Sequence, residues 1–180
     1  MLIAREKRKN NIAEYLLYMW QVEDTIRACN FDMNILEKRI VSQFTENEKV
    51  KAEIREWYAD LILMMHEEGI KEAGHLRILR SQVDELYELH KRLLGDKKDV
   101  KYIEQYYWAA PNIKEFEKRL KGQTANEIET CLNGLYALLL LRLQKKDISG
   151  ETQEAMQTFS NLLAILSERF KEIETGKQEF

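Results

Sequence analysis

The sequence predicts an all-α protein, an antiparallel up-and-down helical bundle of six or seven helices. The chain has 180 residues but only one proline and seven glycines, the two residue types that most disfavour a helix interior. Charged residues make up 33% of the chain and hydrophobic residues 44%, a balance typical of amphipathic helices that share a core. Because the connections between the helical segments are short, we expect antiparallel neighbours.

Four helices are predicted in the first half of the chain, where apolar residues recur at helical spacing. They span residues 11–29, 32–44, 45–69 and about 71–95. Asp32 is a suitable N-cap, and Thr45 begins a capping box with Glu48. Gly69 is suited to end the third helix in the left-handed conformation. Residues 1–10 are expected to form a basic, solvated segment ahead of the first helix.

Three helices are predicted in the second half, over residues 100–120, 124–143 and 149–174. Pro111 lies inside the first of them, so we expect that helix to be kinked or broken near Ala110. Thr124 begins a second capping box. The stretch Leu135–Leu143 is apolar on nearly every side, which favours a position at the centre of the bundle. Residues 175–180 are expected to be a frayed tail.

Length, charge and cysteine content suggest a single cytoplasmic domain over residues 1–180. The net charge is −3, and basic residues cluster only near the N-terminus, so we expect no nucleic-acid partner. Cys29 and Cys131 are too few for a disulfide framework and indicate a reducing compartment. No apolar run approaches the roughly 20 residues of a membrane span, and the N-terminal apolar run is too short for a signal peptide. We therefore expect no membrane association.

The best metal candidates are Glu72 and His75, which form a Glu-x-x-His pair on a predicted helix. Carboxylate-bridged di-iron bundles use two such pairs with further glutamates, and a second pair is missing here. His66 could approach His75 across the turn at Gly69. We expect structural roles for these residues, with no metal and no other cofactor. A metal-dependent helical-bundle enzyme that uses His66, Glu72 and His75 is the alternative.

Glu23 is the most unusual charged residue, because it lies within the apolar face of the first predicted helix, between Met19 and Ile26. A carboxylate in such a position needs a partner or a raised pKa. Arg27, one turn further on, and Arg142, in the leucine-rich helix, are the candidate partners. We predict a structural ion pair near the core in preference to a catalytic acid.

No catalytic residue is predicted. His90 lies on a core-facing stripe, where we expect it to be hydrogen-bonded within the core. Cys29 ends a helix, where the dipole disfavours a thiolate. The glycines are scattered and form no phosphate-binding loop.

Aromatic residues on the fifth helix are the candidate interface. Tyr106, Tyr107 and Trp108 are consecutive, so they fan over about 200° of the helix surface and cannot all face one core. Tyr102 lies one turn earlier and widens the same patch. Aromatic side chains outside a core are enriched at protein interfaces, although tyrosines also pack their rings while keeping their hydroxyls solvated. A small-ligand pocket beneath Pro111, lined by Tyr107 and Trp108, is a further alternative.

Three stretches resemble an uncharacterised family of all-helical domains of unknown function, about 180 residues long, from Bacteroidetes-type bacteria. They are AREKRKNNIAEYLLYMWQVEDTIRAC at Ala4–Cys29, EIREWYADLI at Glu53–Ile62 and NEIETCLNGLYALLLLRLQKKDIS at Asn126–Ser149. The resemblance implies a single-domain bacterial cytoplasmic protein. It implies no activity, cofactor or catalytic residue.

The leading functional hypothesis is a soluble, non-enzymatic helical protein that acts through self-association or a protein partner. A symmetric homodimer is the commonest outcome of self-association. The alternatives are the metal-dependent enzyme and the small-ligand-binding bundle.

Overall fold

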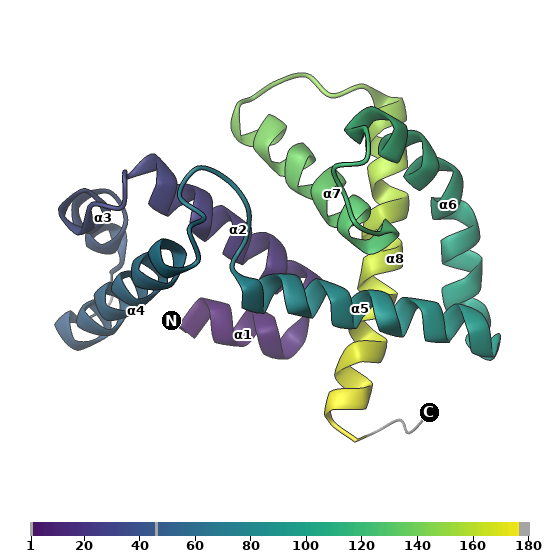
Figure 1. The fold of residues 1–180 in the computed structure, drawn as a ribbon, viewed down its shortest axis with the longest axis horizontal. Coiled ribbons are helices and arrows are strands. Elements are labelled where there is room, and N and C mark those ends of the chain that lie inside the picture. Colours follow the sequence, from purple (N-terminus) through teal and green to yellow (C-terminus); the bar gives the residue numbers. More distant parts are fainter. Residues whose placement is uncertain (1, 46, 177–180) are drawn as a thin grey trace.

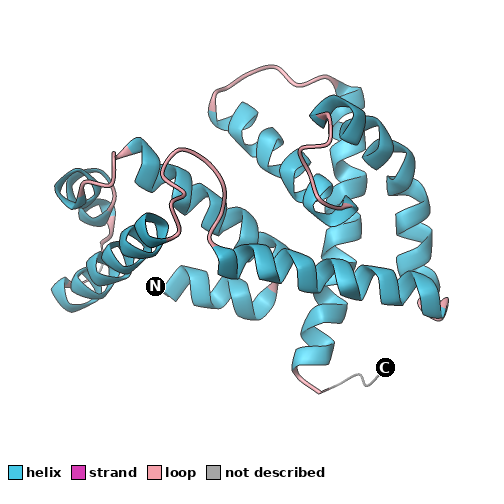
Figure 2. Ribbon diagram, in the orientation of Figure 1, coloured by secondary structure: helices cyan, strands magenta, loops and turns pink. Residues whose placement is uncertain are grey.

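The computed structural model describes residues 2–45 and 47–176, and within these ranges the chain forms eight α-helices and no strand (Figures 1 and 2). The helices are α1 (Leu2–Asn10), α2 (Ile12–Ala28), α3 (Met33–Arg39), α4 (Glu48–Glu67), α5 (Arg77–Asp96), α6 (Val100–Leu120), α7 (Glu127–Leu143) and α8 (Gly150–Glu174), with a 3-10 turn, η1, at Val41–Gln43. The predicted all-α class is confirmed. None of the described helices is long and apolar enough to cross a bilayer.

The central helix of the fold is α8, which contacts α2, α5, α6 and α7. Its buried hydrophobic side chains are Met156, Phe159, Leu162, Leu163, Ile165, Leu166 and Phe170. Figure 1 shows α6 and α7 beside α8, while α5 runs across α8 from the group formed by α1 to α4. Because α5 crosses α8 instead of lying along it, the up-and-down arrangement does not extend to every neighbouring pair.

The leucine-rich end of α7 does not lie at the centre of the bundle, contrary to the prediction. Within Leu135–Leu143 only Leu138 is buried, and Leu143 is 59% exposed. Most of the buried side chains of α7 lie in its first half, among them Ile128, Cys131 and Leu132. The apolar residues of a helix show which turns it is able to bury. Which of those turns are buried depends on the helices that pack against it.

Residues 1–10, which were predicted to be a solvated segment, contain a helix that packs on the core. Ala4 of α1 is buried in the hydrophobic cluster. Arg8 forms a bidentate ion pair with Glu174 of α8, with nitrogen–oxygen distances of 2.6 and 2.9 Å, and its guanidinium lies over the ring of Phe170. At the other end of the chain, Thr175 and Gly176 follow α8, and the rest of the predicted tail, residues 177–180, lies outside the described residues.

Of the two predicted alternatives, a helix kinked or broken near Ala110, the broken helix is wrong, because α6 is one continuous helix through Pro111. Figure 1 shows that α6 curves along its length. A proline removes one backbone donor and bends a helix without necessarily ending it. Both halves of α6 remain anchored, since Tyr102 lies in the core before the proline and Ile113 after it.

Candidate functional site

Glu23 is completely buried, and its carboxylate binds the segment that leads into α5. The backbone N–H of Leu76 donates to Oε1 at 2.8 Å, and Nδ1 of His75 lies 2.6 Å from Oε2. The predicted partners are therefore wrong: Arg27 pairs with a different carboxylate, and Arg142 is exposed at the far end of α7.

The Glu23 carboxylate also caps a helix. The N-cap residue of α5 is Leu76, which has no side chain able to accept a hydrogen bond. Glu23 accepts a hydrogen bond from the N–H of Leu76, and Glu68 accepts one from the N–H of Arg77 at 2.7 Å. Two carboxylates thus satisfy donors that a helix start leaves free, and they lie at the positive end of the helix dipole.

Arg27 of α2 binds the connection between α4 and α5. It forms an ion pair with Asp24 at 2.8 Å, and its Nη2 donates to the carbonyl oxygens of Ile70 and Gly74. Asp24 in turn accepts a hydrogen bond at 2.6 Å from the hydroxyl of Tyr136 on α7. Burial, reinforced by this bond to Asp24, raises the pKa of Tyr136. The network therefore joins α2, the α4–α5 connection and α7.

His75 is the one partly accessible imidazole in this network. Its ring stacks on Trp20 with 4.2 Å between centroids and 12° between planes, and its side chain is 24% exposed. Nε2 has no hydrogen-bond partner among the described residues. A histidine oriented by a buried carboxylate can transfer protons. In the described structure, however, the two polar partners of the Glu23 carboxylate are His75 and Leu76, directly before α5, so the carboxylate holds α2 against the start of α5.

The three metal candidates do not converge. His66 packs against Phe31, with ring centroids 4.9 Å apart, while His75 is bound to Glu23. Glu72 is exposed and lies in the irregular segment before α5, so the Glu-x-x-His pair is not on a helix as predicted. Among the described residues, no group of three or more histidine, cysteine, aspartate or glutamate side chains could hold a metal ion.

A second polar network surrounds His90, which is 1% exposed, as its core-facing position predicts. Nδ1 lies 2.6 Å from the hydroxyl of Tyr102, and Nε2 lies 3.0 Å from the carboxylate of Glu127 on α7. The hydroxyl of Tyr106 donates to the same carboxylate at 2.9 Å. Tyr102 is completely buried, so its predicted place in an interface is wrong. In the core its hydroxyl has a buried partner, His90.

The pKa values in this network follow from its hydrogen bonds. The bond from His90 lowers the pKa of Glu127, and the bond from Tyr106 adds to this effect while burial opposes it. Burial and the nearby Glu127 carboxylate raise the pKa of Tyr106 to about 12. Glu127 is thus stabilised as an anion and Tyr106 as a neutral phenol, which is the pairing that their hydrogen bond requires.

Replacing Glu127 with glutamine is expected to reduce the free energy of unfolding at pH 7 by about 1–2 kcal/mol. A carboxylate whose pKa is lowered by folding adds stability above its ordinary value of 4.5, and that stability is lost as the pH falls through the folded value. The variant should therefore lose less stability than the wild type below about pH 4.5. Urea unfolding between pH 3 and pH 7 measures both effects, with exposed Glu53→Gln as the control. Equal acid sensitivity of variant and wild type would contradict the assignment.

The outward face of α6 carries two large aromatic side chains. Tyr107 is 72% exposed and Trp108 is 59% exposed, and their rings meet edge to face with centroids 5.6 Å apart. Val100, two turns before Tyr107, is also exposed. Of the four predicted interface residues, Tyr107 and Trp108 therefore face solvent, Tyr106 is partly buried and Tyr102 belongs to the core.

A groove of about 540 Å³ lies beside Trp108, between α6 and the first turns of α8. Asn112 and Phe116 extend its wall along α6, and Met156 faces them from α8. The groove is close to Pro111, where a ligand pocket was predicted, and it is lined by Trp108 but not by Tyr107.

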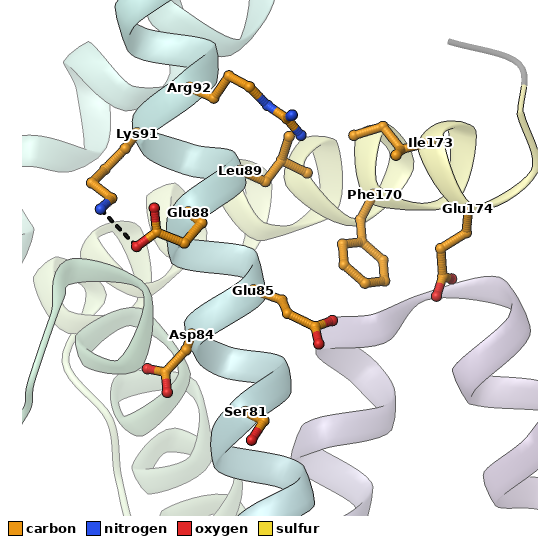
Figure 3. A pocket seen from close by; sticks show the side chains of 10 residues that line it. All are labelled: Ser81, Asp84, Glu85, Glu88, Leu89, Lys91, Arg92, Phe170, Ile173 and Glu174. Carbon is orange, nitrogen blue, oxygen red and sulfur yellow. Dashed lines mark ion pairs between the residues drawn. The ribbon is translucent and has the colours of Figure 1, made fainter. Parts of the chain in front are cut away.

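A wider, open cleft of about 900 Å³ lies between α5 and the last turns of α8 (Figure 3). Asp84, Glu85 and Glu88 extend from α5, and Phe170 and Ile173 approach from α8. Its charges are largely engaged with neighbours, since Glu88 pairs with Lys91 at 2.7 Å and Glu174 pairs with Arg8. The cleft is an open, charged depression of the surface.

The comparison with protein families decides the classification of the chain. The model of the family described as "Domain of unknown function (DUF4924)" matches residues 1–177. The chain belongs to this DUF4924 family. No curated protein and no solved structure matches the chain. The predicted resemblance to an uncharacterised helical family is confirmed, and membership in the DUF4924 family assigns no activity to the residues described above.

Proposed function

We propose that this DUF4924 protein acts by association, as a homodimer formed through the outward face of α6. The observation that carries the proposal is the exposure of Tyr107 and Trp108. Tyrosine and tryptophan are among the residues that contribute most to binding energy at interfaces. Two of them side by side on one face give a large apolar surface whose burial would favour association.

The charge distribution along α6 supports the same proposal. Residues 105–113 contain no charged side chain, and exposed charged residues lie on either side, with Glu104 before the segment and Lys114 after it. Interfaces commonly have a centre depleted of charge and a polar rim. The exposed Pro111 lies in the same uncharged segment and adds apolar surface without a flexible side chain.

The proposed function is that of a non-enzymatic protein in the cytoplasm. Both histidine–carboxylate pairs use their polar atoms to hold helices together, which supports structural roles for Glu23 and Glu127. Cys29 and Cys131 are buried free thiols, which suits a reducing compartment.

Sedimentation velocity between about 1 and 100 µM tests the proposal, because a dimer with micromolar affinity dissociates within this range. We expect a concentration-dependent dimer, and we expect Trp108→Ala to raise its dissociation constant by roughly tenfold or more. Ile78→Ala is the matched control, since Ile78 of α5 is 60% exposed but lies on another helix. A wild-type monomer at every concentration, or a dimer that Trp108→Ala leaves unchanged, would contradict the proposal.

A further inference from the structure

The exposed face of α6 is a regular stripe of side chains. Spacings of four and three residues place Val100, Glu104, Tyr107, Pro111, Lys114 and Lys118 on one side of the helix, and all six are exposed. The stripe has polarity: its first half carries the acidic Glu104, its centre is apolar, and its last half carries two lysines. The acidic half of one stripe can therefore face the basic half of a second stripe only if the two helices run in opposite directions.

We infer that the occupant of this face is α6 of a second copy, packed antiparallel to the first. This inference rests on the proposed homodimer and adds its direction and register. A two-fold axis beside Ala109, midway between Tyr107 and Pro111, places Tyr107 of each copy opposite Pro111 of the other. The same register places Glu104 of each copy opposite Lys114 of the other, so two ion pairs form by symmetry.

A parallel pairing is unfavourable for the same residues. A two-fold axis along the helices would place Glu104 beside its own copy and Lys114 beside its own copy, and like charges at close range repel. In the antiparallel register, each Glu104 instead faces a Lys114 of the other copy, so both contacts are attractive. It also places Val100 opposite Lys118, whose aliphatic stem can cover an apolar side chain while its ammonium stays in solvent.

The charges that this register uses are available within one copy. Glu104, Lys114 and Lys118 form no ion pair in the part of the chain that the structure describes, and the one electrostatic effect of Lys114 there is to help lower the pKa of Glu127 on α7. Nearby charges on α6 are already engaged, since Glu115 pairs with Arg119 and Lys101 lies 4.0 Å from Glu168. The stripe therefore presents its unpaired charges on the two sides of the aromatic centre, where a partner can reach them.

Charge reversal measured by sedimentation velocity tests the register. Glu104→Lys and Lys114→Glu each place two like-charged pairs across the interface, so each should raise the dissociation constant about tenfold at low salt, and less at high salt. The double variant, Glu104→Lys with Lys114→Glu in one chain, restores opposite charges and should recover wild-type affinity. Glu53→Lys, an exposed reversal on α4, is the control, and urea midpoints verify that each variant folds.

The outcomes separate the register from the proposed function. Single reversals that weaken the dimer, together with recovery in the double variant, support the antiparallel register. A dimer that depends on Trp108 but not on either single reversal overturns the register and leaves the proposed function standing. A wild-type monomer overturns both.

Discussion

Replacing Glu23 with alanine is expected to lower the free energy of unfolding by about 3–5 kcal/mol. The substitution removes the acceptor of the buried N–H of Leu76 and the hydrogen-bond partner of Nδ1 of His75. It also removes the carboxylate that caps α5 and creates a cavity beside Trp20. Guanidinium unfolding followed by far-ultraviolet circular dichroism measures the loss.

Two further variants make the Glu23 prediction specific. Glu23→Gln keeps the volume and one acceptor oxygen, so we expect a smaller loss of about 1–3 kcal/mol. Glu14→Ala removes an exposed carboxylate of the same helix, paired with Lys7 at 3.3 Å, and should cost less than about 1 kcal/mol. If Glu23→Ala were no more destabilising than Glu14→Ala, the buried network would not be a major source of stability.

Replacing Gly134 with alanine is expected to destabilise the protein by about 2–3 kcal/mol, even though alanine is the better helix former. A Cβ atom at Gly134 would lie 2.9 Å from two ring atoms of Phe159 and 3.1 Å from the sulfur of Met156. Phe159 is completely buried, so its ring has little room to move. Helices α7 and α8 would have to separate, which thermal unfolding would detect as a lower Tm.

A matched glycine controls for helix propensity. Gly95 lies inside α5, and a Cβ built there meets nothing within 4 Å. Gly95→Ala should therefore be neutral or stabilise by up to about 1 kcal/mol. A shortened ring partner provides the second check, because Phe159→Leu combined with Gly134→Ala should lose less stability than the sum of the two single variants. Strict additivity would argue against contact at this helix crossing.

Local sequence signals predicted the helices well where only one signal was available. Asp32 caps α3, and Gly69 has the left-handed conformation after α4, both as predicted. Where two candidate caps lay close together, the choice was wrong: Asn47 caps α4 in place of Thr45, and Asn126 caps α7 in place of Thr124. Spacing alone does not distinguish adjacent capping residues, because each can accept the same kind of hydrogen bond.

At the candidate sites, the sequence identified an unusual residue but did not identify the residues that it contacts. Glu23 was identifiable because a carboxylate within an apolar stripe is visible in the sequence. Its partners were not, since His75 and Leu76 lie 52 and 53 residues further along the chain and meet it only through tertiary packing. The consecutive aromatics of α6 likewise predicted that some rings face outward. Only the rotation of α6 against its neighbours decides that these are Tyr107 and Trp108.

The cap that α2 supplies to α5 has a consequence for the order of folding. Most helix starts are completed by a residue at the boundary itself, so they can form as soon as the local chain is free. The first turn of α5 instead takes one of its two capping carboxylates from a residue 53 positions before Leu76, and closing so long a loop is an entropic cost that local helix formation does not carry. Residues 68–76 are therefore expected to order late, after α2 and the body of α5 have met. The start of α5 therefore depends partly on tertiary packing, through Glu23, and not only on the sequence around it.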